Sequence, residues 1–275
     1  MTQPLGETLA RPSLPLEVVR GMGELTLKLS VLEEGGGQPE VFNTVQGEGR
    51  HIGQPTAFMR LSECNQHCNF CDTAFTWAFT PRLAEFHDDK KVYDKEQWQV
   101  QKPVSEMVNL VYATNPNSVV VTGGEPMMQQ RAIANFADGI REVNPDYHIE
   151  VETAGTIPPT QAMAERVSHF NVSPKLPSSG NDPRTALKPA VLRKFAELPN
   201  ADFKFVITDD ADMEHVLRVV EESGMPANRV YLMPEGRNKE ELARYGDKVA
   251  QLAVKHGFNL TTRLHIMLWG DKKNV

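Results

Sequence analysis

The sequence predicts an α/β fold with a mostly parallel sheet, arranged either as a partial barrel or as a doubly wound sheet. From about residue 55 onward, short β-rich runs alternate with amphipathic helical segments, which is typical of βαβ units. About six units are present, whereas a closed eight-unit barrel needs more chain than these 275 residues provide. With 40% hydrophobic and 24% charged residues, the composition is that of a globular protein with a large core.

The strands are expected where short runs rich in β-branched and aromatic residues occur. These runs are PTAFMRLS (55–62), SVVVTG (118–123), YHIEVET (147–153), HFNVSP (169–174), DFKFVIT (202–208), RVYLMP (229–234) and a weaker seventh, TRLHIML (262–268). Between them, apolar residues recur at helical spacing, and Gly224 and Gly257 follow the last two helices. The predicted helices cover 104–114, 130–143, 185–198, 211–223 and 239–257.

One core domain, residues 39–275, is predicted with two additions. Residues 1–38 are rich in Pro, Gly and Glu and are expected to form an irregular N-terminal extension, in which LTLKLSV (26–32) alternates like a short edge strand. Residues 74–103 form a long insertion that contains Trp77 and Trp98. Such an insertion is either a binding loop or lid, or a surface excursion with a small core of its own.

Charge and hydropathy exclude several classes of partner. The chain has 29 Lys and Arg against 36 Asp and Glu, a formal net charge of −7, which argues against binding nucleic acid or an anionic membrane. No apolar run approaches the roughly 18 residues of a transmembrane helix, and the N-terminus lacks the pattern of a signal peptide. We therefore expect a soluble, cytoplasmic protein with no nucleic-acid or membrane partner.

The three cysteines lie within eight residues, as Cys64, Cys68 and Cys71. An odd, clustered set is a poor disulfide framework and suits a reducing compartment. Three thiolates can hold three irons of a 4Fe–4S cluster and leave the fourth iron open. Zinc is the main alternative, with His67 or a distant residue as fourth ligand, although zinc sites usually contain paired C-x2-C units and no second pair exists here.

A second motif, TGGEP, follows the strand SVVV and begins at Thr122. Paired glycines at the carboxyl end of a strand allow the backbone to approach a ligand closely. A glycine pair alone is weak support for a site, because most such pairs are tight turns. Here it follows the strand that comes after the cysteine motif.

Together these two motifs resemble the radical S-adenosylmethionine (SAM) superfamily. The C-x3-C-x2-C loop has an aromatic residue, Phe70, before its third cysteine, and TGGEP is similar to that superfamily's contact with the SAM amino group. The resemblance implies a partial (βα)6 TIM-like barrel. It also implies a 4Fe–4S cluster whose open iron is chelated by SAM, and one-electron cleavage of SAM to a 5′-deoxyadenosyl radical.

Further motifs resemble the 7-carboxy-7-deazaguanine synthase family. They are FNTVQGEG (42–49), FMRL (58–61), CDT (71–73), SPK (173–175) and RLHIMLWG (263–270). The resemblance implies a lyase that converts 6-carboxy-5,6,7,8-tetrahydropterin to 7-carboxy-7-deazaguanine and ammonia, on the route to queuosine and other 7-deazapurines. Hydrogen abstraction at C6 and a radical ring contraction are implied, with SAM regenerated and Mg2+ as an additional cofactor. No side chain is expected to be the sole acid or base.

The resemblance also assigns residues to the substrate and to Mg2+. Amide, carboxylate and guanidinium groups suit a flat pterin with amide-like edges and a carboxylate. Thr73 is implied as a Mg2+ ligand, although a turn hydroxyl is its simpler reading. The implied substrate residues are Val45, Gln46, Gly47, Glu48, Arg60, Thr122 and His265. A lone histidine in an apolar strand, such as His265, is more often a core residue.

For SAM, the resemblance implies residues beside the cluster and at the carboxyl ends of later strands. They are Phe70, Asp72, Gly124, Ser173, Pro174, Lys175, Met233, Pro234, Glu235 and Gly236. SPK is also compatible with a plain turn, and MPEG (233–236) with a helix start.

A homodimer and a flavodoxin- or ferredoxin-type electron donor are implied as partners. The competing interpretations are another radical SAM enzyme, such as a glycyl-radical activase, and a non-catalytic iron–sulfur or zinc module.

Overall fold

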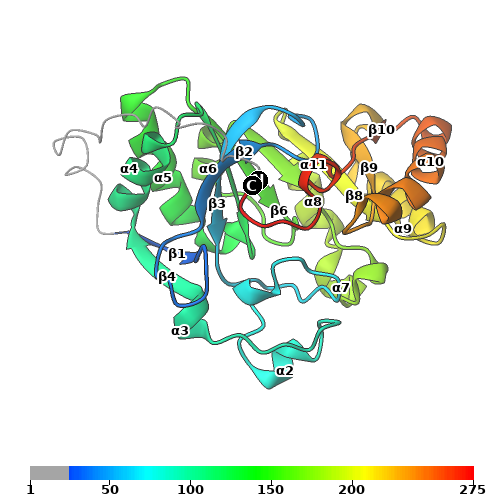
Figure 1. Ribbon diagram of the computed structural model, residues 1–275. Coiled ribbons are helices and arrows are strands. Elements are labelled where there is room, and N and C mark those ends of the chain that lie inside the picture. Colours follow the sequence, from blue (N-terminus) through cyan, green and yellow to red (C-terminus); the bar gives the residue numbers. More distant parts are fainter. Residues whose placement is uncertain (1–24) are drawn as a thin grey trace.

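The computed structural model describes residues 25–275, and within this range the chain forms a ten-stranded sheet with helices on its outer face (Figure 1). The strand order is β10-β9-β8-β7-β6-β5-β3-β1-β4, with β2 paired to β3. All pairs from β3 to β10 are parallel, so the six predicted strands are confirmed in an open sheet that forms a partial barrel. These six are β3 (Pro55–Leu61), β5 (Ser118–Gly123), β6 (His148–Thr153), β7 (His169–Val172), β8 (Ala201–Ile207) and β9 (Val230–Pro234); the short strand β10 (Asn259–Leu260) was not predicted.

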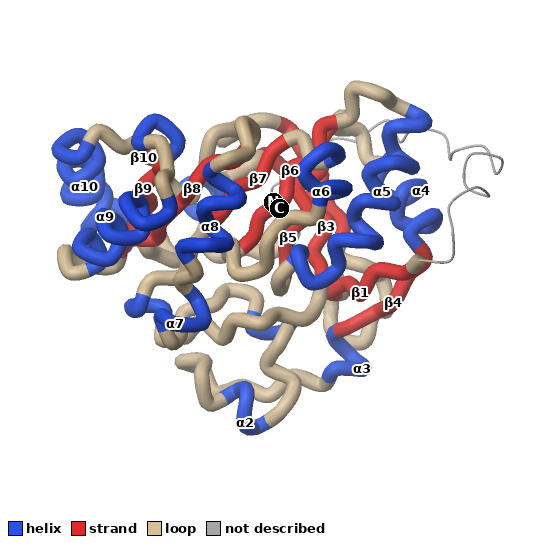
Figure 2. The backbone as a smooth tube through the Cα atoms, turned by 180° about the vertical axis from the view of Figure 1, so that it is seen from behind, coloured by secondary structure: helices blue, strands red, loops and turns tan. Residues whose placement is uncertain are grey.

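Helices between the parallel strands cover the outer face of the sheet (Figure 2). The apolar stripe of α5, including Ile133, Phe136 and Ile140, is fully buried, as its helical period predicts. The main helices are α4 (Val104–Ala113), α5 (Gln130–Val143), α6 (Gln161–Arg166), α8 (Pro189–Ala196), α9 (Asp212–Ser223) and α10 (Lys239–His256). Gly224 and Gly257 cap α9 and α10 in the left-handed conformation, which a glycine adopts without steric cost.

Three antiparallel strands extend the sheet beyond β3. They are β1 (Thr26–Ser30), β2 (Val41–Val45) and β4 (Gln99–Pro103). The prediction that 26–32 is an edge strand is wrong in position, because β4 pairs with the outer side of β1 and forms the edge. Leu27 and Leu29 are therefore fully buried. Residues 1–24 of the predicted N-terminal extension lie outside the described residues.

The predicted strand 262–268 is instead a helix, α11 (Leu264–Trp269). The short apolar run alternates in sequence, but only Ile266 of the helix is buried, whereas Met267 and Leu268 are exposed. The backbone N–H of Leu264 donates to the carbonyl of Gly47, which turns the chain away from the sheet after β10. A run of this length does not separate strand from helix by periodicity.

The predicted helix 185–198 is divided into α7 (Pro183–Ala186) and α8. Pro189 is the first residue of α8, and Lys188 before it has a non-helical backbone. Proline restricts the preceding residue to extended conformations, so the continuous apolar pattern across it does not make one helix.

The insertion 74–103 carries short elements and the edge strand β4. The short elements are η1 (Ala74–Thr76), α2 (Pro81–Ala84) and α3 (Lys95–Trp98). Three further 3-10 turns lie outside the insertion: η2 (Pro126–Gln129), η3 (Pro177–Ser179) and η4 (Ala227–Arg229). Trp77 is the centre of a small buried cluster that also contacts Cys64 and Cys71. The insertion therefore has a satellite core, and this core supports the cysteine loop. No helix in the part of the chain described here is long and apolar enough to cross a bilayer.

Candidate active site

A pocket of about 290 Å³ opens where the parallel strands end. Its walls include Thr122 at the end of β5 and Ser173 directly after β7, since the carboxyl ends of parallel strands meet at one edge. It brings together most residues assigned from the sequence: Val45, Gln46, Gly47, Glu48, Arg60, Cys64, Cys68, Phe70, Cys71, Asp72, Thr73, Thr122, Gly124, Ser173, Lys175, Met233, Glu235, Gly236 and His265.

Two of the assigned residues do not line this pocket. Pro234 instead lines a second, smaller cavity with Leu242 and Leu260. Pro174 is buried, and its two neighbours in the chain, Ser173 and Lys175, line the pocket.

The cysteine loop, residues 64–71, is held at both ends. Glu63 has a positive φ of 73°, which turns the chain sharply at the end of β3 and into the loop. On the other side, the N–H of Asn69 donates to the carbonyl of Ser179 at 3.0 Å, and the N–H of His67 donates to Oδ1 of Asn181 at 2.9 Å. The loop is therefore fixed by the segment that follows the SPK motif.

Each cysteine sulfur accepts a hydrogen bond. The donors are the N–H of Gln66 to Cys64 (3.4 Å), Nδ2 of Asn181 to Cys68 (3.2 Å) and Nε1 of Trp77 to Cys71 (3.4 Å). Burial, with the Glu125 carboxylate second, raises the pKa of Cys64 well above its usual value, and burial also raises the pKa of Cys68. N–H groups that donate to sulfur favour the thiolate form of cysteine. A bound metal also stabilises the thiolate, because it displaces the thiol proton.

His67, the alternative zinc ligand, packs against aromatic rings. Its ring centroid lies 5.3 Å from that of Phe86, nearly parallel to it, and 5.0 Å from that of Trp77. Burial lowers its pKa. These contacts give His67 a packing role in the insertion's small core.

The two glycines of TGGEP allow β5 to end directly against the start of the cysteine loop. A Cβ atom on Gly123 would lie 2.1 Å from the carbonyl oxygen of Leu61, and one on Gly124 would lie 1.9 Å from that of Glu63. Glu125 is buried and accepts hydrogen bonds from Thr153 and from two backbone N–H groups. The motif therefore positions the pocket wall as well as lining it.

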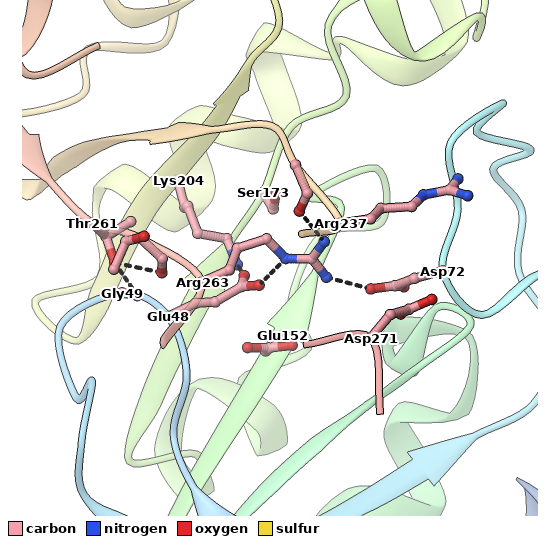
Figure 3. A network of polar contacts seen from close by, with 12 residues as sticks. Glu48, Gly49, Asp72, Glu152, Ser173, Lys204, Arg237, Thr261, Arg263 and Asp271 are labelled. Atoms are coloured by element: carbon pink, nitrogen blue, oxygen red, sulfur yellow. Dashed lines mark hydrogen bonds and ion pairs between the residues drawn. The ribbon is translucent and has the colours of Figure 1, made fainter. Parts of the chain in front are cut away.

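The pocket also has a charged part; we call Glu48, Asp72, Lys204 and Arg263 the charged wall (Figure 3). One carboxylate oxygen of Glu48 is paired with Nζ of Lys204, and the other accepts from Nε of Arg263 at 3.1 Å. Burial alone raises the pKa of Glu48, but attraction to Lys204 and Arg263 outweighs it and lowers the pKa to about 2. Glu48 is therefore ionised at neutral pH.

Arg263 joins distant parts of the charged wall and was not assigned a role from the sequence. Its Nη2 donates to Asp72 at 2.5 Å and its Nη1 to the carbonyl of Gly236 at 3.0 Å (Figure 3). Although burial opposes it, the charges of Arg263 and Lys273 hold the pKa of Asp72 well below its usual range. The only signal for Arg263 in the sequence is its place at the start of RLHIMLWG.

Gln46 is fully buried and both ends of its amide are engaged. Nε2 donates to Glu150 at 2.6 Å, and Oε1 accepts from the N–H of Glu48 at 3.2 Å. Like Arg263, Glu152 was not singled out from the sequence; it lines the pocket and accepts a hydrogen bond from the Thr122 hydroxyl at 2.9 Å. Burial raises the pKa of Glu152, despite the nearby charge of Lys204.

Arg60 projects from β3 and is oriented by another unassigned residue, Glu40. Its Nε donates to Glu40 at 2.8 Å, and both side chains are largely buried. Although burial opposes it, attraction to Glu40 raises the pKa of Arg60, so the guanidinium is charged. This contact fixes the direction of the guanidinium plane at the pocket.

His265 and Lys175 complete the predicted set. A Cβ on Gly47 would lie 2.2 Å from Nδ1 of His265, so a larger residue at position 47 would force the His265 side chain to move. Nζ of Lys175 donates to Oγ of Ser173 at 3.1 Å. Residues 271–275 also line the pocket, and Nζ of Lys273 donates to the carbonyl of Asp72 at 3.1 Å.

Comparisons with known proteins agree with this arrangement. Residues 45–173 match the family described as a 4Fe–4S single cluster domain. The chain is 36% identical over 236 residues to the 7-carboxy-7-deazaguanine synthase of Pyrobaculum aerophilum, covering 85% of this chain and 95% of that protein. It is 31% identical over 237 residues to the 7-carboxy-7-deazaguanine synthase of Hyperthermus butylicus, covering 83% and 91% respectively.

The fold is also similar to that of a solved structure. The crystal structure of QueE from Escherichia coli matches with a TM-score of 0.63, at 20% sequence identity, and covers 90% of this chain and 99% of that one. This similarity supports the partial-barrel architecture.

Proposed function

The chain belongs to the 7-carboxy-7-deazaguanine synthase family, and from this premise we propose that it converts 6-carboxy-5,6,7,8-tetrahydropterin to 7-carboxy-7-deazaguanine with loss of ammonia. It is a radical SAM lyase. One observation carries the proposal: the cysteine loop and the charged wall, which includes the distant residues Lys204 and Arg263, face one pocket. A metal-binding module without turnover has no need for the charged wall.

The cysteine loop fits a 4Fe–4S cluster. Cys64, Cys68 and Cys71 supply three sulfurs with N–H donors, and the chain contains no fourth cysteine, which leaves one iron open. When bound, the cluster and SAM supply a 5′-deoxyadenosyl radical through one-electron cleavage of SAM. Trp77 and the buried alanines around it shield this side of the pocket from water.

The SAM residues are proposed from the family resemblance, and their places at the pocket are compatible with it. Lys175, oriented by Ser173, can pair with the SAM carboxylate. Gly124 presents backbone beside the cysteine loop for the amino group, and Phe70 and Asp72 lie next to it. Met233, Glu235 and Gly236 line the pocket at the end of β9, where the adenine is proposed to bind, with Pro234 behind them.

The charged wall and the β2–β3 turn match the polar edges of a pterin. Glu48 is ionised and can accept from an aminopyrimidine edge, and Arg60 can form a bidentate pair with the substrate carboxylate. Gln46 and Glu152 are held by their neighbours with little freedom to turn. The further residues proposed at the substrate are Val45, Gly47, Thr122 and His265.

Mg2+ is proposed at Thr73. Its hydroxyl is buried at the pocket, 3.5 Å from the sulfur of Cys71. Because Mg2+ keeps several waters and takes few protein ligands, one hydroxyl oxygen with the substrate carboxylate is a sufficient site. We expect Thr73→Val to raise the Mg2+ concentration needed for half-maximal activity while leaving the iron content unchanged. An unchanged Mg2+ dependence would contradict this assignment.

The cellular setting is proposed from family membership alone: a cytoplasmic homodimer in queuosine or other 7-deazapurine biosynthesis, reduced by a flavodoxin- or ferredoxin-type donor. The insertion 74–103 is the candidate docking site for the donor, because its small core contacts Cys64 and Cys71.

The test is an anaerobic assay of the reconstituted enzyme with dithionite, SAM, Mg2+ and 6-carboxy-tetrahydropterin. We expect 7-carboxy-7-deazaguanine without stoichiometric consumption of SAM. If 5′-deoxyadenosine accumulates and no deazaguanine forms, the radical chemistry stands and the proposed substrate is wrong. If neither 5′-deoxyadenosine nor deazaguanine forms, the radical SAM assignment itself is contradicted.

A further inference from the structure

A second polar cluster lies at the opposite end of the strands from the pocket. His148 and His169 are the first residues of β6 and β7, and Asp202 is near the start of β8. His51, on the β2–β3 turn, and Glu150, on β6, complete the group. We call these five residues the histidine floor; none of them lines the pocket.

Three of these residues can converge on one point. The ligand atoms of His51, His148 and Glu150 all lie within 4.8 Å of one another. Nδ1 of His51 is 2.6 Å from Oε2 of Glu150, and the His51 ring is 4.9 Å from that of His148 and 4.7 Å from that of His169, centroid to centroid. Two imidazoles and a carboxylate at this spacing form a recurrent ligand set for zinc and other divalent transition metals.

An independent observation points to a ligand here. Nε2 of His148 and Nε2 of His169 are both buried and accept or donate no hydrogen bond. His169 is only 6% exposed, and its Nε2 is 3.5 Å from Asp202, beyond good hydrogen-bond distance. A buried polar atom left unpaired costs free energy, on the order of 1–3 kcal/mol, and such atoms are uncommon in folded proteins.

Neutral imidazole is the form of histidine that binds a metal, through a ring-nitrogen lone pair. Arg50, paired with Asp202 at 2.5 Å, neutralises the remaining carboxylate of the cluster.

We propose that the histidine floor binds one divalent transition-metal ion of the zinc type through His51, His148 and Glu150, with His169 or water as the fourth ligand. Nitrogen-rich donors favour such an ion over Mg2+ and Ca2+, which prefer oxygen ligands. The side chain of His51 is 18% exposed, so an ion can enter from the outer end of the strands without passing through the catalytic pocket.

The site is coupled to the pocket through one hydrogen bond. Oε2 of Glu150 lies 2.6 Å from Nδ1 of His51, and Oε1 of Glu150 accepts a hydrogen bond from Nε2 of Gln46 at 2.6 Å. Hydrogen-bond partners of a metal ligand fix its orientation, and here the partner of the ligand Glu150 is the pocket residue Gln46. Resting on the proposed function, we infer that metal binding fixes the turn carrying Gln46 and Glu48 and lowers KM for the pterin, with kcat little changed.

Zinc binding tests the site without any activity measurement. Cluster-loaded enzyme, stripped with a mild chelator, is dialysed against Zn2+, and zinc and iron are counted together. We expect one zinc per chain in the intact enzyme and in His215→Gln, a matched control on α9. In His148→Gln and His51→Gln, affinity for zinc should fall by about a hundredfold or more, since even outer partners of a metal typically contribute 10- to 100-fold.

X-ray absorption at the zinc edge identifies the ligands in the intact enzyme, so the proposal does not depend on the variants folding. Nitrogen and oxygen neighbours at about 2.0–2.1 Å support the histidine floor. Sulfur neighbours at about 2.3 Å place zinc on the cysteine loop and overturn the proposal. It is equally overturned if folded, cluster-loaded enzyme binds no zinc, or if His148→Gln binds zinc as tightly as His215→Gln. These outcomes are independent of whether deazaguanine forms.

Discussion

The cysteine loop and the charged wall face the same pocket, but their polar atoms are satisfied in different ways. The sulfurs of Cys64, Cys68 and Cys71 receive long hydrogen bonds from neutral donors. Glu48, in contrast, is held by two cations, Lys204 and Arg263. The loop is thus prepared for a metal that brings its own positive charge, whereas the wall is already charge-compensated by the protein.

This difference indicates which part of the site depends on its cofactor. A buried thiol with a raised pKa gains most from binding iron, because the metal replaces the proton. A carboxylate whose pKa is lowered to about 2 is preorganised before any ligand binds. We therefore expect the two regions to fail separately when they are mutated.

Replacing one cysteine should have the largest effect. Cys64→Ala, Cys68→Ala and Cys71→Ala each remove one of the three iron ligands in the chain, so the cluster should be lost and product should fall below detection. The charged wall should remain folded, because its ion pairs involve no cysteine. Iron content after anaerobic reconstitution is the measurement, and normal iron in all three variants would rule out the cluster assignment.

Glu48→Gln should spare the cluster and impair the substrate side. The amide keeps the shape of the side chain but leaves Lys204 and Arg263 without their shared carboxylate. Hydrogen bonds to charged groups contribute about 1.5–3 kcal/mol each, so kcat/KM for the pterin should fall about a hundredfold or more. Steady-state kinetics measures this. Asp210→Asn, in an exposed pair with Lys248, is the control and should stay within about twofold.

The same variant tests the pH dependence of stability. The folded pKa of Glu48 is lowered to about 2, so its contribution is complete above the unfolded value near 4.5 and is lost as pH falls toward 2. The difference in unfolding free energy between the natural chain and Glu48→Gln should therefore shrink by about 1 kcal/mol from pH 7 to pH 4. Urea unfolding at both pH values measures it. A difference that grows on acidification would contradict the assigned charge state.

Asn181→Ala should have the smallest effect and belongs to the cysteine loop. It removes the Nδ2 donor to Cys68 and the acceptor of the His67 N–H. A net hydrogen bond is worth about 0.5–1.5 kcal/mol, so turnover should fall about two- to tenfold at full iron content. Without the donor, the reduction potential of the cluster should become more negative, which a potentiometric titration measures. Asn144→Ala, outside the pocket, is the control; an unchanged potential would show that the donor is irrelevant.

Local patterns predicted the parts of this fold that depend on local sequence. The apolar runs of β5 and β8 and the helical stripe of α5 are visible without any tertiary contact. Pro189 and the helix α11 show the limit, since short apolar runs fit either period until their neighbours are known.

The candidate site was predicted where motifs mark it and missed where pairing is long-range. The cysteines and Glu48 stand in recognisable motifs, and the structure brings them to one pocket. Arg263 meets Glu48 across 215 residues, and Glu40 orients Arg60 from a preceding segment that reads as a loop. No spacing rule encodes such pairs, because they are set by sheet register and strand order.

The separation of the two regions can be tested in a single measurement on Glu48→Gln. Arg263 links Glu48 to Asp72, which directly follows Cys71, so this variant alters a chain of contacts that joins the wall to the loop. We would record the electron paramagnetic resonance spectrum of its reduced cluster with and without SAM. Spectra that match those of the natural chain, alongside the loss of pterin turnover, are the predicted result. A changed cluster spectrum, or failure of SAM to perturb it, would contradict the account.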